Sequence, residues 1–199
     1  MKNQALQIVL ASASPYKKKQ LETLRLPFIC ATPGVDETPL PQEDSSDHAR
    51  RLAELKARAI VVNQDSLIIA CDQSAEIRGS ILGKALTREK AAAQLLACSG
   101  QKALFHSAVA VLNTHTSELK SEVTTTTVQF RHLSEREILH YLDREYVLDC
   151  AGSFKAEALG IALFEAIESS DPSALIGLPL IALNSLLIHN GVNALLYDD

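Results

Sequence analysis

The sequence lacks several features that mark other classes of protein. Its four cysteines are far apart and form no C-x-x-C pair, so buried free thiols are a better expectation than disulfides or a zinc site. We therefore expect a reducing, cytoplasmic environment. No apolar run approaches the roughly 18 residues of a membrane-spanning helix, and the apolar stretch near the N-terminus is too short for a signal peptide. The sequence predicts neither export nor membrane anchoring.

An excess of positive charge is missing as well. The chain has 19 Lys and Arg against 24 Asp and Glu, which gives a formal net charge of −5. Proteins that bind duplex nucleic acid normally present a basic face, and the lysines at 17–19 are too local to reverse the acidic balance. Aromatic residues interleaved with basic ones, typical of single-strand binding, are lacking too. We expect no nucleic-acid partner and favour a small anionic substrate.

Two common nucleotide-binding motifs are also absent from the sequence. Without a G-x-x-x-x-G-K-[ST] stretch, a P-loop nucleotide switch is disfavoured, and without G-x-G-x-x-G after the first apolar run, so is a dinucleotide oxidoreductase. The sequence contains no internal repeat and no low-complexity segment. At 199 residues and 47% apolar content, we expect one compact domain over residues 1–199.

The most informative segment that is present covers residues 8–19, Ile-Val-Leu-Ala-Ser-Ala-Ser-Pro-Tyr-Lys-Lys-Lys. An apolar strand here runs into small hydroxyl residues and then into a lysine-rich helix. Ser14 can cap the helix N-terminus, and Pro15 suits its first position because the N–H at that position has no partner within the helix. The remaining N–H groups and the helix dipole favour a negative ligand, so we expect a phosphate site here.

The apolar patterning predicts an α/β fold with a mixed, twisted sheet flanked by helices. We expect strands over residues 5–11, 27–31, 66–72, 103–112, 119–130 and 160–167, with a short hairpin over 75–84. Helices are expected over 15–25, 48–62, 87–97, 135–144 and 179–189, with a helical turn from 171, and Ser134 and Glu137 form a capping box. The apolar run at 66–72 is expected to present Asp72 at the C-terminal end of its strand.

Four groups of polar residues could carry chemistry. They are Ser12, Ser14, Lys17 and Lys18; Asp36 and Glu37; Asp72 and Gln73 with Lys84; and segment 152–157 with Lys155 and Glu157. Taken singly, each has a plainer explanation as a solvated lysine face, an acidic loop, a turn cap or a surface lysine. Together they supply what hydrolysis of a nucleotide phosphoanhydride requires, which is cations for the phosphates, carboxylates for a divalent cation and a general base.

Six ordered motifs resemble the Maf family of nucleotide pyrophosphatases, also called septum formation inhibitors. They are L-A-S-A-S-P (10–15), V-D-E (35–37), R-L-A-E-L-K-A (51–57), C-D-Q (71–73), G-K (83–84) and I-G-L-P (176–179). The resemblance covers essentially the whole chain. The stretch G-S-F-K-A-E at 152–157 resembles the branch that hydrolyses 7-methyl-GTP, rather than the dTTP/UTP branch.

This resemblance implies a two-lobed, inosine triphosphatase-like fold with a central cleft. The implied reaction is hydrolysis of a nucleoside triphosphate between its α and β phosphates with Mg or Mn. It implies that Asp72 accepts the proton, that Glu37 and Asp72 hold the metal, and that Tyr16, Gln73 and Glu157 determine specificity. The implied substrate-binding residues are Ser12, Ser14, Lys17, Lys18, Lys56, Lys84 and Lys155. Tyr16 can stack on the cationic 7-methylguanine ring, and Glu157 can accept hydrogen bonds from guanine N–H groups.

Several positions depart from the family pattern. Lys17 and Lys18 stand where the family usually has arginine, so a bidentate phosphate fork becomes point charges. Tyr16 replaces a tryptophan, and Ala85 replaces the proline that usually follows the Gly-Lys pair. Three other functions stay open, namely a dTTP/UTP pyrophosphatase, a non-catalytic nucleotide-binding regulator of cell division and a nucleic-acid-binding module. The hairpin at 103–130 and the apolar final helix are surfaces through which a homodimer could form.

Overall fold

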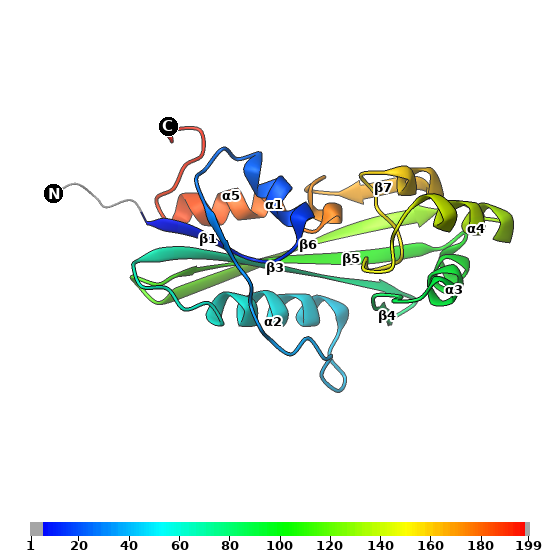
Figure 1. Cartoon of the computed structure of the whole chain (residues 1–199), viewed down its shortest axis with the longest axis horizontal. Helices are drawn as coiled ribbons and strands as arrows, with labels where there is room; N and C mark the ends of the chain where they lie inside the picture. The colour runs from blue at the N-terminus through cyan, green and yellow to red at the C-terminus, as the bar shows by residue number, and fades with distance from the viewer. Residues whose placement is uncertain (1–5, 198–199) are drawn as a thin grey trace.

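A computed structural model describes residues 6–197 of the chain, and a mixed sheet of seven strands forms the centre of this part (Figure 1). The strand order is β2-β1-β3-β5-β6-β7, and β4 pairs with the end of β3. The strands are β1 (Gln7–Ala11), β2 (Ile29–Ala31), β3 (Ser66–Ile77), β4 (Ser80–Leu82), β5 (Lys102–Asn113), β6 (Glu118–Phe130) and β7 (Phe164–Ser169). β1 is parallel to β2 and β3, and the other neighbours are antiparallel. The predicted mixed sheet is confirmed.

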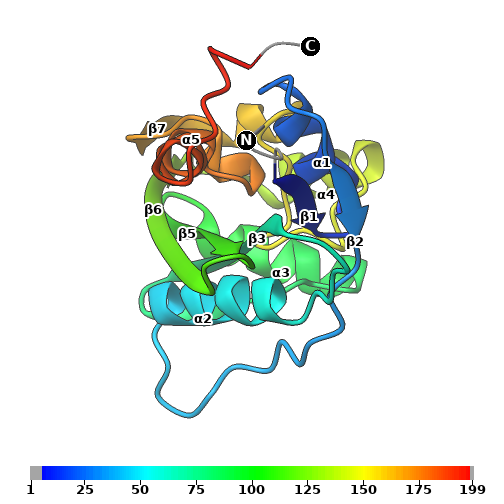
Figure 2. The ribbon, with the colours of Figure 1, turned by 90° about the vertical axis from the view of Figure 1, so that its left-hand side faces the viewer.

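Helices cover both faces of this sheet. They are α1 (Pro15–Glu22), α2 (Ser45–Arg58), α3 (Arg88–Cys98), α4 (Glu135–Arg144) and α5 (Leu180–His189), with short 3-10 helices η1 (Leu159–Leu163) and η2 (Ala174–Ile176). Figure 2 shows α2 beneath the sheet, with α1 and α5 above it. The α/β class with flanking helices is therefore confirmed, and so is the capping box of Ser134 and Glu137.

The packing divides the structure into two lobes at the two ends of the long strands. In one lobe, Ile68 and Ala70 of β3 pack against α2, while Leu67 and Ile69 pack against α1 and α5 on the opposite face. This is the alternation expected of a strand buried on both sides. In the other lobe, residues of β3, β5 and β6 pack with α3 and α4 around a group of phenylalanines. The sheet is continuous through both lobes, so the middle of the sheet lies at the bottom of any cleft between the lobes.

The boundaries of three predicted elements were wrong. α2 begins at Ser45 rather than at 48, because the Asp44 side chain caps it by accepting from the Asp47 N–H, and it ends before 62. α1 ends at Glu22 because the chain turns there and reaches a positive φ at Arg25. The strand predicted at 160–167 begins as η1, and its strand part starts at Phe164. The predicted start of the first strand, at residue 5, lies outside the described residues.

The predicted position of Asp72 at a strand end was also wrong, because β3 continues to Ile77. β1 pairs with β3 as far as Ile69, and β4 pairs with it from Ala75 onward. Within residues 6–197, positions 70–74 of β3 therefore pair with a strand on the β5 side alone. We call this gap beside residues 70–74 the notch. Asp72 sits in mid-strand at the notch, beyond the end of the parallel strand β1.

The cysteines and the apolar helices agree in part with expectation. All four cysteines are free, but Cys71 and Cys98 are buried, whereas Cys30 is exposed and Cys150 is half-buried. The expectation of buried thiols thus holds for two of them. Among the described residues, every helix is too short or too polar to cross a membrane.

Candidate active site

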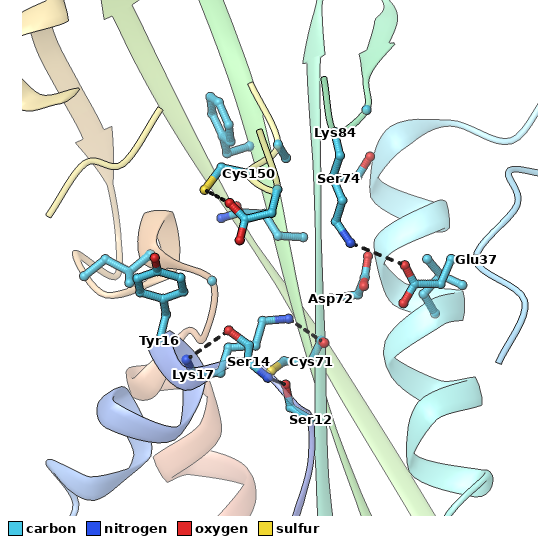
Figure 3. Close-up of a pocket in the computed structure, with 18 of the residues that line it drawn as sticks. Ser12, Ser14, Tyr16, Lys17, Glu37, Cys71, Asp72, Ser74, Lys84 and Cys150 are labelled. Atoms are coloured by element: carbon cyan, nitrogen blue, oxygen red, sulfur yellow. Dashed lines mark hydrogen bonds and ion pairs between the residues drawn. The ribbon is translucent and has the colours of Figure 1, made fainter. Parts of the chain in front are cut away.

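A cavity of about 820 Å³ opens at the notch. Its walls are the first turn of α1, one face of α2, the exit of β4 and the segment 149–157. Side chains alternate along β3, so Asp72 faces α2, while Gln73 faces η2 on the other side of the sheet. Figure 3 shows Asp72, Glu37 and Lys84 on one side of β3, and Ser14, Tyr16 and Lys17 on the other. The notch thus lets both faces of the sheet contribute to one cavity.

The ammonium of Lys56 lies between two carboxylates in this cavity. Its Nζ is 2.6 Å from Asp72 Oδ1 and 2.6 Å from Glu37 Oε1. Lys56 comes from α2, whose small residues Ala53 and Ala57 pack directly on the sheet and bring the helix close to β3. Lys56 and Asp72 are both buried, at 8% exposure each. A buried lysine that is paired in this way forms a fixed positive charge between two acids.

The ionisation of this group follows from its contacts. Burial alone would lower the pKa of Lys56, but Asp72 and Glu37 outweigh burial and raise it above the ordinary lysine value. Burial would likewise raise the pKa of Glu37, but the hydrogen bond and charge of Lys56 lower it. Near neutral pH, Lys56 is therefore cationic and Glu37 anionic.

Glu37 lies on a loop that α2 holds in place. Arg51 of α2 donates to the Thr38 carbonyl at 3.1 Å and forms two hydrogen bonds with Glu43, at 2.5 and 2.8 Å. His48 contacts the same Glu43 carboxylate at 2.9 Å. The Arg51 hydrogen bond keeps the pKa of Glu43 well below its ordinary value. Because Thr38 is the residue after Glu37, this network fixes the loop next to the site.

The predicted cap of α1 by Ser14 is confirmed, and we call Ser12, Ser14 and this first helical turn the α1 cradle. Ser14 Oγ accepts from the Lys17 N–H at 3.5 Å, and Ser12 Oγ accepts from the Ser14 N–H at 3.1 Å. The Lys17 Nζ crosses to the notch and donates to the Cys71 carbonyl at 2.9 Å. That carbonyl is accessible because no strand covers it within the described residues. Lys18 lies outside the cavity and is exposed, since successive helix residues point about 100° apart.

Gln73 is held in one orientation. Its Nε2 donates to Ser107 Oγ at 2.9 Å and to the carbonyls of Ala174 and Leu175, each at 3.0 Å. Two backbone carbonyls can accept only from the nitrogen of the amide, so they define which end of the side chain is which. The amide oxygen is left as the group that can face a ligand.

The ring of Phe154 anchors the segment 149–157 to a group of other phenylalanines. The ring of Phe154 makes edge contacts with Phe105, Phe130 and Phe164, with centroid distances of 5.1, 5.8 and 4.8 Å. The Lys155 N–H donates to the hydroxyl of Tyr141 on α4 at 3.2 Å. The backbone of Lys155 is therefore fixed, while its side chain and the exposed Glu157 line the cavity.

At Gly160 the chain of η1 comes very close to the backbone of the segment 149–157. A Cβ at this position would lie 2.4 Å from the Lys155 carbonyl oxygen. The chain of η1 therefore packs directly on the backbone of the 149–157 segment. This close approach is incompatible with an ordinary side chain at position 160.

Glu37 and Asp72 are the carboxylates of this site that could ligate a metal ion. Among the described residues, no group of three or more His, Cys, Asp and Glu side chains gathers in a way that could hold a metal ion. Glu37 and Asp72 nevertheless converge on one point, which Lys56 shares. Magnesium in nucleotide sites is commonly held by one or two carboxylates together with substrate phosphates and water. This donor set fits a cation that arrives with a nucleotide.

The structure brings nearly all the predicted residues together. Lining the cavity are Ser12, Ser14, Tyr16, Lys17, Glu37, Lys56, Asp72, Gln73, Lys84, Lys155 and Glu157, and Lys18 does not reach it. Sequence reasoning missed Asp149, which lines the cavity directly before Cys150. It also missed the anchoring role of Arg51, although this residue begins one of the motifs. The sequence signal that could have identified Asp149 is its position as an acidic residue directly before the stretch 150–157.

Comparisons with known proteins show what this chain is similar to. The family described as Maf-like protein matches residues 7–190. A protein of Aromatoleum aromaticum named 7-methyl-GTP pyrophosphatase is 50% identical over 186 residues, which cover 93% of this chain and 96% of the relative. A protein of Vibrio cholerae with the same name is 48% identical over 192 residues, covering 96% of this chain and 100% of the relative. Among solved structures, the Staphylococcus aureus Ham1 protein matches with a TM-score of 0.47 and 18% identity, over 63% of this chain and 72% of its own.

Proposed function

This chain belongs to the Maf-like protein family, and we propose that it is a nucleoside triphosphate pyrophosphatase that converts 7-methyl-GTP into 7-methyl-GMP and pyrophosphate. The observation that carries the proposal is the position of Lys56, 2.6 Å from both Asp72 and Glu37, in the cavity that also contains the α1 cradle. Relatives with 45–50% identity over nearly their whole length are named for this activity.

The proposed reaction requires the phosphates to be held and a water to be activated. Ser12, Ser14 and the N-terminus of α1 bind phosphate oxygens, and Lys17 and Lys84 neutralise their charge. Asp72 accepts a proton from the water while the water oxygen bonds to the α-phosphorus. The bond from that phosphorus to the bridging oxygen breaks, and pyrophosphate leaves with the bond electrons. Lys56 stabilises the negative charge that develops.

A divalent cation, Mg or Mn, is part of this proposal. Glu37 and Asp72 are the residues that would hold it, and it would supply charge neutralisation and a more acidic water. Glu37 is already anionic, because Lys56 lowers its pKa. Lys84 Nζ lies 3.9 Å from Glu37 Oε2. The Lys84 ammonium is therefore close enough to bind the same phosphate group as the cation that Glu37 would hold.

Recognition of the base is assigned to the other side of the cavity. Glu157 is exposed and lines the cavity, which supports a role in which its carboxylate accepts hydrogen bonds from guanine N1–H and the exocyclic amine. Gln73 offers its amide oxygen, because its nitrogen is already bonded. Tyr16 supplies a ring for stacking on the base.

The experiment is a turnover assay over a nucleotide panel. Purified protein with Mg or Mn is incubated with 7-methyl-GTP, GTP, dTTP and UTP, and pyrophosphate and monophosphate are quantified. We expect the highest kcat/KM for 7-methyl-GTP, and a loss of about 10²-fold or more in Asp72→Asn. Asp65→Asn, an exposed residue paired with His115, is the matched control.

Three results would count against the proposal. Higher kcat/KM for dTTP or UTP would move the chain to the pyrimidine branch, and tight nucleotide binding without turnover would favour the regulator of cell division. Full activity in Asp72→Asn would remove Asp72 from its role. A cytoplasmic location and a homodimer stay predictions, to be tested by fractionation and by light scattering.

A further inference from the structure

The ammonium of Lys155, a residue that lines the cavity, lies close to two aromatic rings. Its Nζ is 5.3 Å from the ring centroid of Tyr16 and 5.8 Å from that of Tyr146. Both distances are within the range of cation–π attraction, in which the electron-rich ring face favours a positive charge. Tyr16 comes from the first turn of α1 and Tyr146 from the loop after α4, so two distant segments converge on one cation.

Tyr146 has no evident structural role to explain this position. Its side chain is 66% exposed and does not belong to the aromatic core that Phe154 forms with its neighbours. By contrast, Tyr141 on the same stretch is buried and binds the Lys155 N–H. Tyr146 lines a second, smaller cavity, and its link to the cavity at the notch is its contact with Lys155, which lines that cavity. Aromatic rings around a cation are a feature of sites for positively charged ligands.

We propose that Tyr16 and Tyr146 form an aromatic cage for a cationic nucleobase, and that the Lys155 ammonium occupies this cage until the base displaces it. The inference rests on the proposed function, because 7-methylguanine carries the positive charge that the cage selects. It adds Tyr146 as a specificity-determining residue and gives the substrate-binding residue Lys155 a defined role beside the base.

The anchoring of Lys155 makes such a displacement feasible. Phe154 and the Tyr141 hydroxyl fix its backbone, so only the flexible side chain has to move. A cationic base then replaces one cation–π contact by another, with additional stacking. A neutral guanine must displace the same ammonium without restoring the charge contact. Displacing Lys155 costs both bases the same contacts, but the displaced ammonium stays tethered nearby and repels only the cationic base. Removal of this ammonium should therefore favour the methylated base.

The first test uses Tyr146→Leu, with Tyr146→Phe as the variant that keeps the ring. Cation–π contacts of 0.5–2 kcal/mol correspond to a loss of roughly 2- to 30-fold in affinity. We expect Tyr146→Leu to weaken binding of 7-methyl-GMP by this factor, while GMP binding changes less than about twofold, and Tyr146→Phe to bind as the wild type does. Tyr197→Leu is the control, because Tyr197 is a partly exposed tyrosine that neither lines the cavity nor contacts the Lys155 ammonium.

Binding can be followed without turnover because the chain has no tryptophan and four tyrosines. Titration with 7-methyl-GMP should quench tyrosine fluorescence, and Tyr146→Leu should reduce the quench at saturation. In Lys155→Met, which removes the competing cation, the ratio of GMP to 7-methyl-GMP dissociation constants should rise. These monophosphate measurements do not depend on hydrolysis, so the cage can be confirmed or rejected even if 7-methyl-GTP is not turned over.

The proposal is overturned if Tyr146→Leu weakens GMP and 7-methyl-GMP equally, or neither. It is also overturned if Lys155→Met lowers the preference for the methylated base, since Lys155 would then assist that base rather than stand in for it. Should Tyr146→Leu unfold, the Tyr146→Gln variant gives the same comparison, because it also lacks the ring.

Discussion

Arg51 binds the backbone carbonyl of Thr38 at 3.1 Å, directly after Glu37 in the sequence. The same guanidinium binds the Glu43 carboxylate, so one side chain of α2 holds the acidic loop at two points. A carboxylate on a loop keeps a fixed position only with such an anchor, because loops are more mobile than the elements that they connect. Arg51 is therefore a positioning residue for Glu37.

The anchor predicts a pH dependence of stability. Arg51 holds the pKa of Glu43 below its ordinary value, so the contribution of Glu43 to stability is full above about pH 4.3, its value in an unfolded chain, and is lost as the pH falls through the folded value. We expect Glu43→Gln to be less stable than the wild type at pH 7, with a smaller gap at pH 3. Urea unfolding at both pH values measures this. Exposed Glu165→Gln should show no such gap, and a gap for Glu43→Gln that widens in acid would contradict the anchor.

Lys17 and Lys18 provide a matched test of the phosphate cradle. They are neighbours with the same side chain, but Lys17 lines the cavity and Lys18 is exposed outside it. Charged hydrogen bonds contribute about 1.5–3 kcal/mol, so we expect Lys17→Met to raise the KM for the nucleotide by roughly tenfold or more. Lys18→Met should change KM by less than about twofold. Equal effects of the two variants would mean that general positive charge, rather than the cradle, binds the phosphates.

Local patterns were sufficient for the elements whose signals are local. The capping box of Ser134 fixed the start of α4, and the long alternating hairpin 103–130 gave β5 and β6 almost to the residue. The beginning of α2 was missed because the helical spacing was read from residue 48, four residues after the real cap, Asp44. A helix cap and apolar periodicity are separate signals, and the predicted start of α2 rested on periodicity alone.

The notch is a different case, because it depends on the relative lengths of three strands. Asp72 was expected at a strand end since the apolar run stops there, but β3 continues through more polar residues to Ile77. No local sequence pattern indicates that β1 stops pairing with β3 at Ile69, or that the pairing of β4 with β3 starts at Ala75 of β3. Likewise, the motifs placed Lys56 in the site through family resemblance, whereas its contact with both acids comes from the close packing of α2 on the sheet. The contact of Tyr146 with Lys155 had no sequence signal.

Gly160 gives a test of how the cavity wall is built. A methyl group at this position would lie 2.4 Å from the Lys155 carbonyl oxygen, so Gly160→Ala must push η1 and the 149–157 segment apart. We expect a loss of about 1–3 kcal/mol in the free energy of unfolding and a higher KM, because Lys155 and Glu157 shift together. Gly34→Ala is the control, since a Cβ there meets nothing within 4 Å. If Gly160→Ala left both stability and KM unchanged, the close approach would not constrain the wall.

The charge arrangement around Lys56 predicts a shift in the pH–rate profile. Lys56 holds the pKa of Glu37 below its ordinary value, and loss of that cation in Lys56→Met removes its main stabilising partner. The pKa of Glu37 should then rise, so the acidic limb of the kcat/KM profile should move to higher pH, in addition to a lower plateau from lost phosphate binding. Lys56→Arg keeps the positive charge, so its acidic limb should stay near that of the wild type even if its plateau falls. A profile that keeps its acidic limb in Lys56→Met would show that Glu37 does not titrate in this step, and the role of metal ligand would pass to Asp72 alone.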